Sequence, residues 1–330
     1  APTYHATAEY GVSYSPYSRI NWVAAVDWVW DDLAPDVRMD LASRMIDYVY
    51  AFMHRWGSQH HSGGFYYSYN MYWYAGLVLL NDELGDLHYR RGLAVLEKGW
   101  QDYQRVMTYR RKGRGDFGQY GLRLDYTLHH YPYAEWHFLH AWQSAVDWRI
   151  PAAWQHSAMF PNGLLWNRLP DFQNFGFDVG WHTSNCLNKG DVYAHVSEHM
   201  HFYAESHPRL AAMSHYLRRE LEAVGCRGGH WHLGVCPFLL TNLDKAPSPE
   251  PPAHLPVARY APRLGVVYMA SGFGADDTYA AFRLIGGKQR DSTHFVIYKK
   301  GFLALDAGAR KGGVKQYHGY WAQTIAHNCV

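Results

Sequence analysis

The sequence predicts an α+β protein with an all-helical first domain of helix hairpins and an antiparallel β domain after it. Three observations support this fold class. Apolar residues recur at helical spacing through most of 1–241, a proline-rich stretch follows at 242–262, and short apolar runs with a strand pattern occupy 263–330. We therefore expect domains at 1–241 and 263–330, joined by a linker at 242–262.

The first domain consists of helices that come in pairs. A helical pattern covers 19–33, and Pro35 can open the next helix in its first turn. That helix runs to Gly57, a suitable C-cap. The same design recurs in SYNMYWYAGLVLLNDEL with LHYRRGLAVLEKGWQDYQRVMTYRR, in YTLHHYPYAEWHFLHAWQSAVDW, and in VYAHVSEHMHFYAE with PRLAAMSHYLRRELEAVG. Successive helix pairs with short connections predict a helical array or a toroid.

The chain changes character at residue 242. Five prolines lie between Pro247 and Pro256 inclusive, which is incompatible with a regular helix and indicates an extended linker. After it come GVVYMASG, TYAAFRLIG, HFVIYKKG and FLALDAG. These runs are apolar, β-branched or aromatic, with turn residues between them, so they predict antiparallel strands.

Composition narrows the function classes. Lys and Arg number 31 against 29 Asp and Glu, a net charge of only +2, so no global basic field indicates a nucleic-acid partner. No run of 18 apolar residues is present, so we expect no membrane span. Phe, Trp and Tyr make up 17% of the chain. Such rings stack on sugar faces, or fill the seams between helices.

Three residues near the end of the chain are of the types that hold a divalent metal. His294, Asp306 and His327 each lie in or beside a predicted strand. A set of two histidines and one carboxylate with an open position suits zinc. The alternative is a polar core in which the histidines bond backbone carbonyls.

The wording of this region resembles a known family. DSTHFVIYKKGFLALDAGAR followed by YWAQTIAHNCV is similar to the metal-bearing β domain of the heparinase II/III-like polysaccharide lyases, over about the last 70 residues. The resemblance implies an α/α toroid followed by a β-sandwich, which would here lack its last strands. It also implies a structural Zn²⁺, or another divalent metal, at His294, Asp306 and His327. The family often has a His-x-His pair where this chain has GKQ at 287–289, so His294 replaces the first ligand.

Catalytic candidates gather in DYTLHHYPYAEW at 125–136. At helical spacing Tyr126, His129 and His130 share one face with Tyr133, while Tyr131 and Glu135 form a second pair. The resemblance implies a tyrosine near the start of such a helix as the acid, or as both acid and base. We assign this role to Tyr131, with Tyr126 as the next choice. The alternative is that these tyrosines only pack within the helical domain.

Further candidates lie on either side. The stretch HHSGGFYYSYNMYWYAG resembles the family helix that presents an Asn or a His to the substrate carboxylate, and Asn70 falls at that position, although it could also be a helix N-cap. Expected substrate-binding residues are Glu135, Arg123, Trp181 and His182. A separate cluster, His195, Glu198, His199, His201 and Glu205, has histidines at helical spacing but lacks the HExxH order of helical metal sites.

These residue types suit β-elimination from a uronate-containing acidic polysaccharide. The rivals are a glycoside hydrolase using carboxylates such as Asp116, Asp125 and Glu135, a uronyl C5-epimerase, and a non-catalytic glycan-binding protein. We expect an exported protein of the bacterial periplasm or the extracellular space, excised from a longer chain. The sequence leaves open the polymer, endo or exo action, a homodimer, and a bridge between Cys226 and Cys236.

Overall fold

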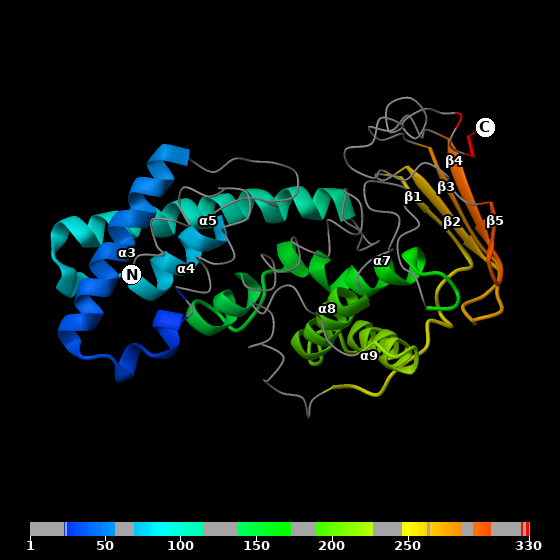
Figure 1. Cartoon of the computed structure of the whole chain (residues 1–330), viewed down its shortest axis with the longest axis horizontal. Coiled ribbons are helices and arrows are strands. Elements are labelled where there is room, and N and C mark those ends of the chain that lie inside the picture. Colours follow the sequence, from blue (N-terminus) through cyan, green and yellow to red (C-terminus); the bar gives the residue numbers. More distant parts are fainter. Residues whose placement is uncertain are drawn as a thin grey trace. The chain divides into compact units, whose positions relative to one another are not determined.

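The computed structural model describes residues 23, 25–56, 69–114, 138–172, 189–226, 246–262, 265–284, 293–304, 325 and 328–329. Two compact units emerge from the distances between Cα atoms, residues 1–109 with 130–154 and residues 110–129 with 155–330. Each unit contains its own buried hydrophobic cluster. Figure 1 shows the elements along the chain.

The first unit is helical where it is described. Its main helices are α3 (Pro35–Trp56), α4 (Tyr69–Leu79) and α5 (Asp86–Arg114), with short 3-10 turns at Trp30–Asp32 and Asp82–Leu84. Residues 138–145 form a further helix. The three helices α3, α4 and α5 confirm the helices predicted from the apolar spacing.

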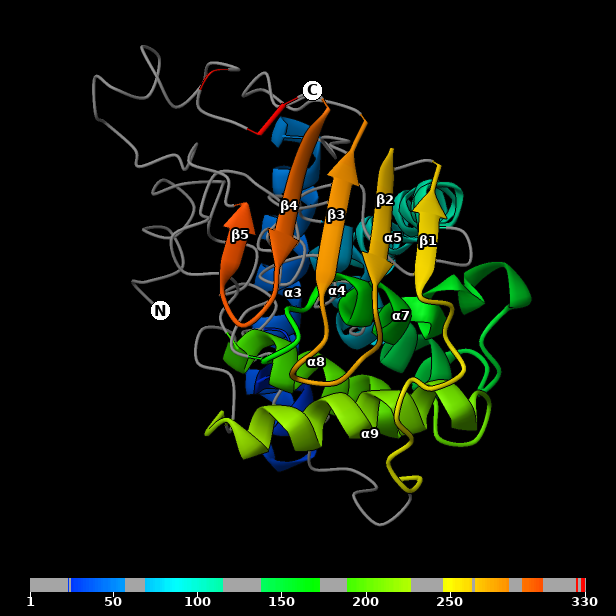
Figure 2. The same cartoon turned by 90° about the vertical axis from the view of Figure 1, so that its right-hand side faces the viewer.

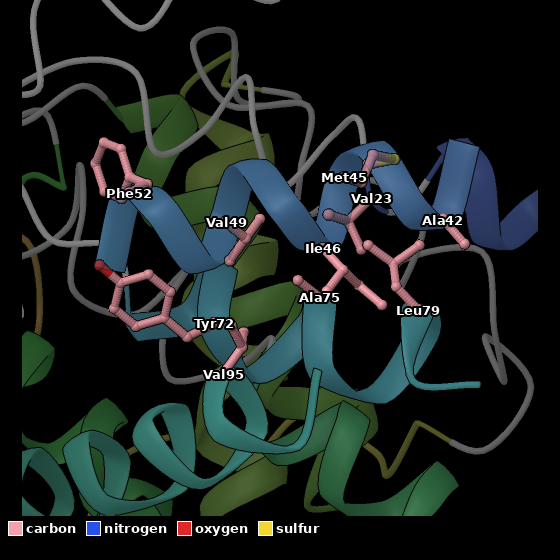
Figure 3. Close-up of a cluster of buried hydrophobic side chains, with 10 residues drawn as sticks. All are labelled: Val23, Ala42, Met45, Ile46, Val49, Phe52, Tyr72, Ala75, Leu79 and Val95. Atoms are coloured by element: carbon pink, nitrogen blue, oxygen red, sulfur yellow. The ribbon is translucent and has the colours of Figure 1, made fainter. Parts of the chain in front are cut away.

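A stripe on α3 forms the core of this unit. The spacing of its buried apolar residues repeats every three or four positions, as expected for one helix face. Figure 3 shows this face packed on side chains of α4 and α5; the cluster comprises Val23, Ala42, Met45, Ile46, Val49, Phe52, Tyr72, Ala75, Leu79 and Val95.

Glycines allow α4 and α5 to approach closely. A Cβ atom added at Gly76 would lie 2.5 Å from the Cβ of Leu96, and one added at Gly99 would collide with the backbone of Trp73. Next to this crossing, aromatic rings stack on one another. Trp100 lies 5.3 Å from Trp142, centroid to centroid, in a stacked arrangement. These tryptophans therefore fill the seam between helices, which is one of the two roles expected for the aromatic residues.

The apolar periodicity did not predict the first helical segment of the second unit. A 3-10 helix at Ala152–Met159 leads into α7 (Phe160–Asn167). Every residue of α7 is buried, so it has no polar face and hence no amphipathic pattern to recognise. The predicted pair α8 (Lys189–Phe202) and α9 (Pro208–Ala223) is confirmed. No helix in the described part of the chain is long and apolar enough to cross a membrane.

A five-stranded antiparallel sheet completes this unit. The strands are β1 (Ala258–Ala261), β2 (Val266–Ala270), β3 (Tyr279–Arg283), β4 (His294–Tyr298) and β5 (Phe302–Ala304). They lie side by side in sequence order, as Figure 2 shows. Strands β2 to β5 were predicted, whereas β1 begins inside the stretch expected to be linker. The boundaries of the predicted domains stay predictions, as do closure of a toroid and a second sheet.

One face of the sheet packs against α7 and the residues just after it. Buried side chains alternate along β4, as expected for a strand with one covered face. The hydroxyl of Tyr279 donates to the carbonyl of Trp166 at 2.9 Å. The guanidinium of Arg168 donates to the carbonyl of Phe273 at 2.6 Å, and this buried side chain also stacks on Phe172.

The proline-rich stretch is tied to α9. Residues 246–257 contain no helix or strand, as the prolines predicted. However, Nδ1 of His215 donates to the carbonyl of Pro247 at 2.6 Å. The amide of Glu250 donates to the carbonyl of Ala212 at 3.1 Å. The stretch is therefore anchored along a helix of the same unit.

Candidate functional site

Most of the predicted catalytic and substrate-binding residues lie outside the described residues. This holds for Arg123, Tyr126, His129, His130, Tyr131, Glu135, Trp181 and His182. Asn70 is the second residue of α4, which places it within the first turn of the helix predicted to carry it. Its role toward a substrate and its alternative role as a helix N-cap both stay predictions.

His294 is the predicted metal ligand that the structure describes. It is the first residue of β4 and only 2% exposed. It pairs with Arg283 of β3 on one side and with Cys329 on the other. Directly opposed residues of antiparallel strands project from the same face, so the Cys329 thiol belongs to the face that carries His294.

The C-terminal residues run beside β4. The amide of Phe295 donates to the carbonyl of Asn328 at 3.1 Å. The side-chain amide of Asn328 donates in return to the carbonyl of Phe295 at 3.2 Å. Asn328 is the last residue of the AHN motif. Its two hydrogen bonds to Phe295 join it to β4, the strand that begins with His294.

Two residues at this end of β4 are of types found among zinc ligands. Imidazole and thiolate are both zinc ligands, and His294 and Cys329 supply the two groups on opposed positions. Asp306 and His327 lie outside the described residues, and no group of three His, Cys, Asp or Glu that could hold a metal occurs among the described ones. The set His294, Asp306 and His327 therefore stays a prediction. Sequence reasoning overlooked Cys329, although it follows His327 by two positions.

The histidine cluster on α8 belongs to the packed interior of the second unit. His195, Glu198 and His199 are fully buried, and no metal-holding group is found there among the described residues. Nε2 of His199 lies 2.8 Å from the carbonyl of Ala158, and Nδ1 lies 2.9 Å from the hydroxyl of Ser214. A carbonyl can only accept, so Nε2 carries the proton and Nδ1 accepts from the serine. Both ring nitrogens are thereby engaged.

Burial sets the charge of this histidine. It lowers the pKa of His199 from 6.5 to about 3, although the bond to the carbonyl of Ala158 acts in the opposite direction. The imidazole is therefore neutral near neutral pH. Its role is to hold α8 to α9 and to the segment before α7.

A Ser, His and Asp set in the first unit has the residue types of a nucleophilic triad. Nδ1 of His88 lies 3.1 Å from Oδ1 of Asp47, which also accepts from Arg91. However, Oγ of Ser43 is 3.4 Å from Nδ1 and 3.3 Å from Nε2 of the same ring. An oxygen almost equidistant from both nitrogens cannot lie along either N–H or lone-pair direction. The cluster joins α3 to α5 and does not activate a nucleophile.

Tyr193 of α8 lies next to the guanidinium of Arg218 on α9. Arg218 donates through Nε to the hydroxyl of Tyr193 at 3.2 Å and to Glu222 at 3.1 Å. Burial raises the pKa of Tyr193 above its usual value of 10 even though the arginine lowers it. The hydroxyl of Tyr193 donates a hydrogen bond to Oε1 of the adjacent Glu222 at 3.0 Å. Tyr193 therefore stays protonated and is not poised as a base.

Comparisons with known proteins identify a related fold. No protein-family model matches the chain, and no curated protein matches it. Among solved structures, the crystal structure of heparinase III superposes with a TM-score of 0.53 at 12% sequence identity. The match covers 93% of this chain and 50% of the heparinase III chain. The chain thus spans about half the length of that protein, and it shares with it the arrangement of a helical region followed by an antiparallel sheet.

Proposed function

We propose that the protein is a polysaccharide lyase that cleaves a uronate-containing acidic polysaccharide by β-elimination. The observation that carries the proposal is the likeness to heparinase III over 93% of the chain. The sequence resemblance of the C-terminal segment to this lyase family supports it, and two hydrogen bonds to Phe295 hold Asn328, the last residue of the AHN motif, beside β4. We also propose that the helical region closes as an α/α toroid.

We further propose that the sheet is one layer of a β-sandwich. The face opposite to α7 is apolar across neighbouring strands. Phe282 pairs with Val267 on one side and with Phe295 on the other. Met269 on the same face is 43% exposed. An apolar face of this kind is covered in a two-layer sandwich by a second sheet packed about 10 Å away.

The reaction makes three demands on the enzyme. It must neutralise the C6 carboxylate, remove the proton at C5, and protonate the leaving oxygen at C4. We assign the first to Asn70 and to a protonated histidine, which hydrogen-bond the developing enediolate. We assign the proton transfers to Tyr131 with His129 or His130 beside it, and Tyr126 is the next choice.

A tyrosine base requires a cation nearby, because the reference pKa of tyrosine is about 10. We assign that role to Arg123, which precedes the helix. Glu135, Trp181 and His182 complete the proposed substrate contacts. His294, Asp306 and His327 would hold a zinc ion, and this ion would stabilise the β domain instead of activating a water molecule. Substrates of this type are outside the cell, so the proposal includes export.

The test is an ultraviolet absorbance assay with heparan sulfate, hyaluronan, chondroitin and alginate. Elimination creates an unsaturated uronate that absorbs, whereas hydrolysis does not. We expect the absorbance to grow with one of these polymers and to be lost in Tyr131→Phe, because the phenol that moves the protons is missing. Tyr89→Phe serves as the matched control, since Tyr89 is an exposed residue of α5.

Reducing ends released without absorbance would overturn the proposal in favour of a hydrolase. Binding without any product would favour a glycan-binding protein. Exchange of the C5 hydrogen with solvent without chain cleavage would favour an epimerase. The metal is tested separately by measuring zinc content in the purified protein and in His327→Ala, where we expect loss of the ion and a lower melting temperature.

A further inference from the structure

A turn in the first unit presents an exposed tryptophan. The helix at 138–145 ends in the segment 146–150. Trp148 is 67% exposed, and Val146 in the same turn is 51% exposed. A side chain as large and apolar as tryptophan is usually buried, so an exposed one in an ordered turn indicates a contact surface.

Hydrogen bonds hold this turn in place. Gln143 donates to the carbonyl of Trp148 at 3.2 Å, and the indole of Trp142 donates to the carbonyl of Arg149 at 3.1 Å. The amide of Arg149 donates to Oδ1 of Asp147 at 2.9 Å. The backbone carbonyls of Trp148 and Arg149 therefore both accept hydrogen bonds from side chains of the preceding helix. The exposure of Trp148 is a property of the fold and needs no further rearrangement.

The neighbouring arginine lies over the tryptophan ring. The Cζ atom of Arg149 is 4.9 Å from the ring centroid of Trp148, which is within cation–π range. The arginine side chain is exposed, and among the described residues its side chain contacts this ring. The guanidinium therefore keeps N–H donors for an external acceptor, and it can bind a carboxylate or a sulfate through two parallel hydrogen bonds.

We propose that Trp148 and Arg149 form a binding subsite for one acidic sugar unit of a polysaccharide. The indole stacks on the sugar ring, and the guanidinium binds its carboxylate or sulfate. Asp147 lies in the same turn, and its negative charge cancels the long-range field of Arg149. Binding of the sugar unit therefore depends on direct stacking on the indole and direct pairing with the guanidinium. The inference rests on the proposed function for the class of ligand.

The test measures how strongly the full chain is retarded in native gels that contain heparan sulfate, alginate or neutral dextran. We expect Trp148→Ala to weaken binding to the acidic polymer about tenfold, since aromatic stacking contributes up to this factor. Arg149→Gln should weaken binding to the acidic polymer and leave the weak retardation by dextran unchanged. Trp28→Ala is the matched control, because Trp28 is 65% exposed in the same unit and no arginine among the described residues lies over its ring.

The inference is overturned if Trp148→Ala binds like the wild type, if Trp28→Ala loses as much affinity, or if the wild type binds none of the polymers. Loss of a dimer in Trp148→Ala, seen by gel filtration without any glycan binding, would instead assign the turn to a protein contact. Where a polymer is cleaved, binding is measured in the Tyr131→Phe background. Unsaturated product with unchanged binding in Trp148→Ala rejects the subsite alone, whereas Trp148-dependent binding without product rejects the lyase alone.

Discussion

At the scale of single residues, the environment of a histidine decides what it does. His199 and His294 are both buried at 2% exposure or less, and the sequence marks both as possible ligands of a metal. His199 has its two ring nitrogens bonded to Ala158 and Ser214, so it is a structural residue. His294 lies at the end of β4 opposite Cys329, and its proposed role as a zinc ligand stays a prediction.

The depressed pKa of His199 predicts a loss of stability in acid. Its pKa of about 3 in the folded protein lies below the value of about 6.5 expected in the unfolded chain. The unfolded chain therefore binds a proton that the folded chain does not. The contribution is full above pH 6.5, and the free energy of unfolding should fall by up to about 1.4 kcal/mol per pH unit from there towards pH 3. Chemical denaturation between pH 7 and pH 4 measures this slope.

Two variants separate the titration from the hydrogen bond. His199→Phe removes the titrating group, so it should be less stable at pH 7 and show a shallower slope in acid. Ser214→Ala removes one bond of 2.9 Å at a cost of about 1 kcal/mol and should keep the slope. An equal slope in the wild type and His199→Phe would show that other groups cause the acid sensitivity.

At the scale of elements, close contact between α4 and α5 depends on glycine. A Cβ atom at Gly99 would meet the backbone of Trp73, which cannot move without moving α4. A Cβ atom at Gly92, on the same helix, would lie 2.9 Å from the end of the flexible Leu80 side chain. An added methyl group would therefore require movement of a helix backbone at Gly99, but only movement of a flexible side chain at Gly92.

We expect Gly99→Ala to destabilise the protein by about 1 to 3 kcal/mol, since overpacking against backbone forces the helices apart. Gly92→Ala is the control. It should be neutral or stabilising, because alanine gains up to about 1 kcal/mol in helix propensity and the leucine can turn away. Thermal unfolding followed by circular dichroism compares them. Equal melting temperatures for the two variants would contradict a tight crossing at Gly99.

At the scale of the whole molecule, the proline-rich stretch joins α9 to the sheet without being a free tether. Its anchors are the bonds from His215 to the carbonyl of Pro247 and from Glu250 to the carbonyl of Ala212. A linker held in this way keeps the strand that follows it in a defined place on the unit. The sheet and α9 should therefore behave as one folded body.

Hydrogen exchange at the amide of Glu250 tests this anchoring. We expect the amide to be protected in the wild type and to exchange faster in His215→Leu, because that variant loses the 2.6 Å bond to Pro247. His254→Gln is the control, since it changes only a 3.6 Å ion pair with Glu250 at the surface, and such pairs contribute little. Rapid exchange at Glu250 in the wild type would show that the stretch is a mobile linker.

The elements that could be predicted are those with one exposed and one buried face. Periodicity located α3, α5 and α9 because their polar faces meet water. It did not locate α7, whose residues are all buried. It also did not locate β1, whose four residues, ARYA, follow the prolines and are a strand only because they pair with β2. Local sequence carries no record of such a partner.

The sequence by itself determined the residue types of the candidate site. It also determined the succession of helical hairpins followed by strands, since both follow from local pattern. It also marked the AHN segment as the most specific part of the family resemblance. Only the tertiary structure decided that Asn328 bonds Phe295, that Cys329 lies opposite His294, and that His199 is neutral and structural. The reason is physical: spacing along a chain sets which residues share a face, whereas burial and long-range pairing set their charge, their partners and therefore their chemistry.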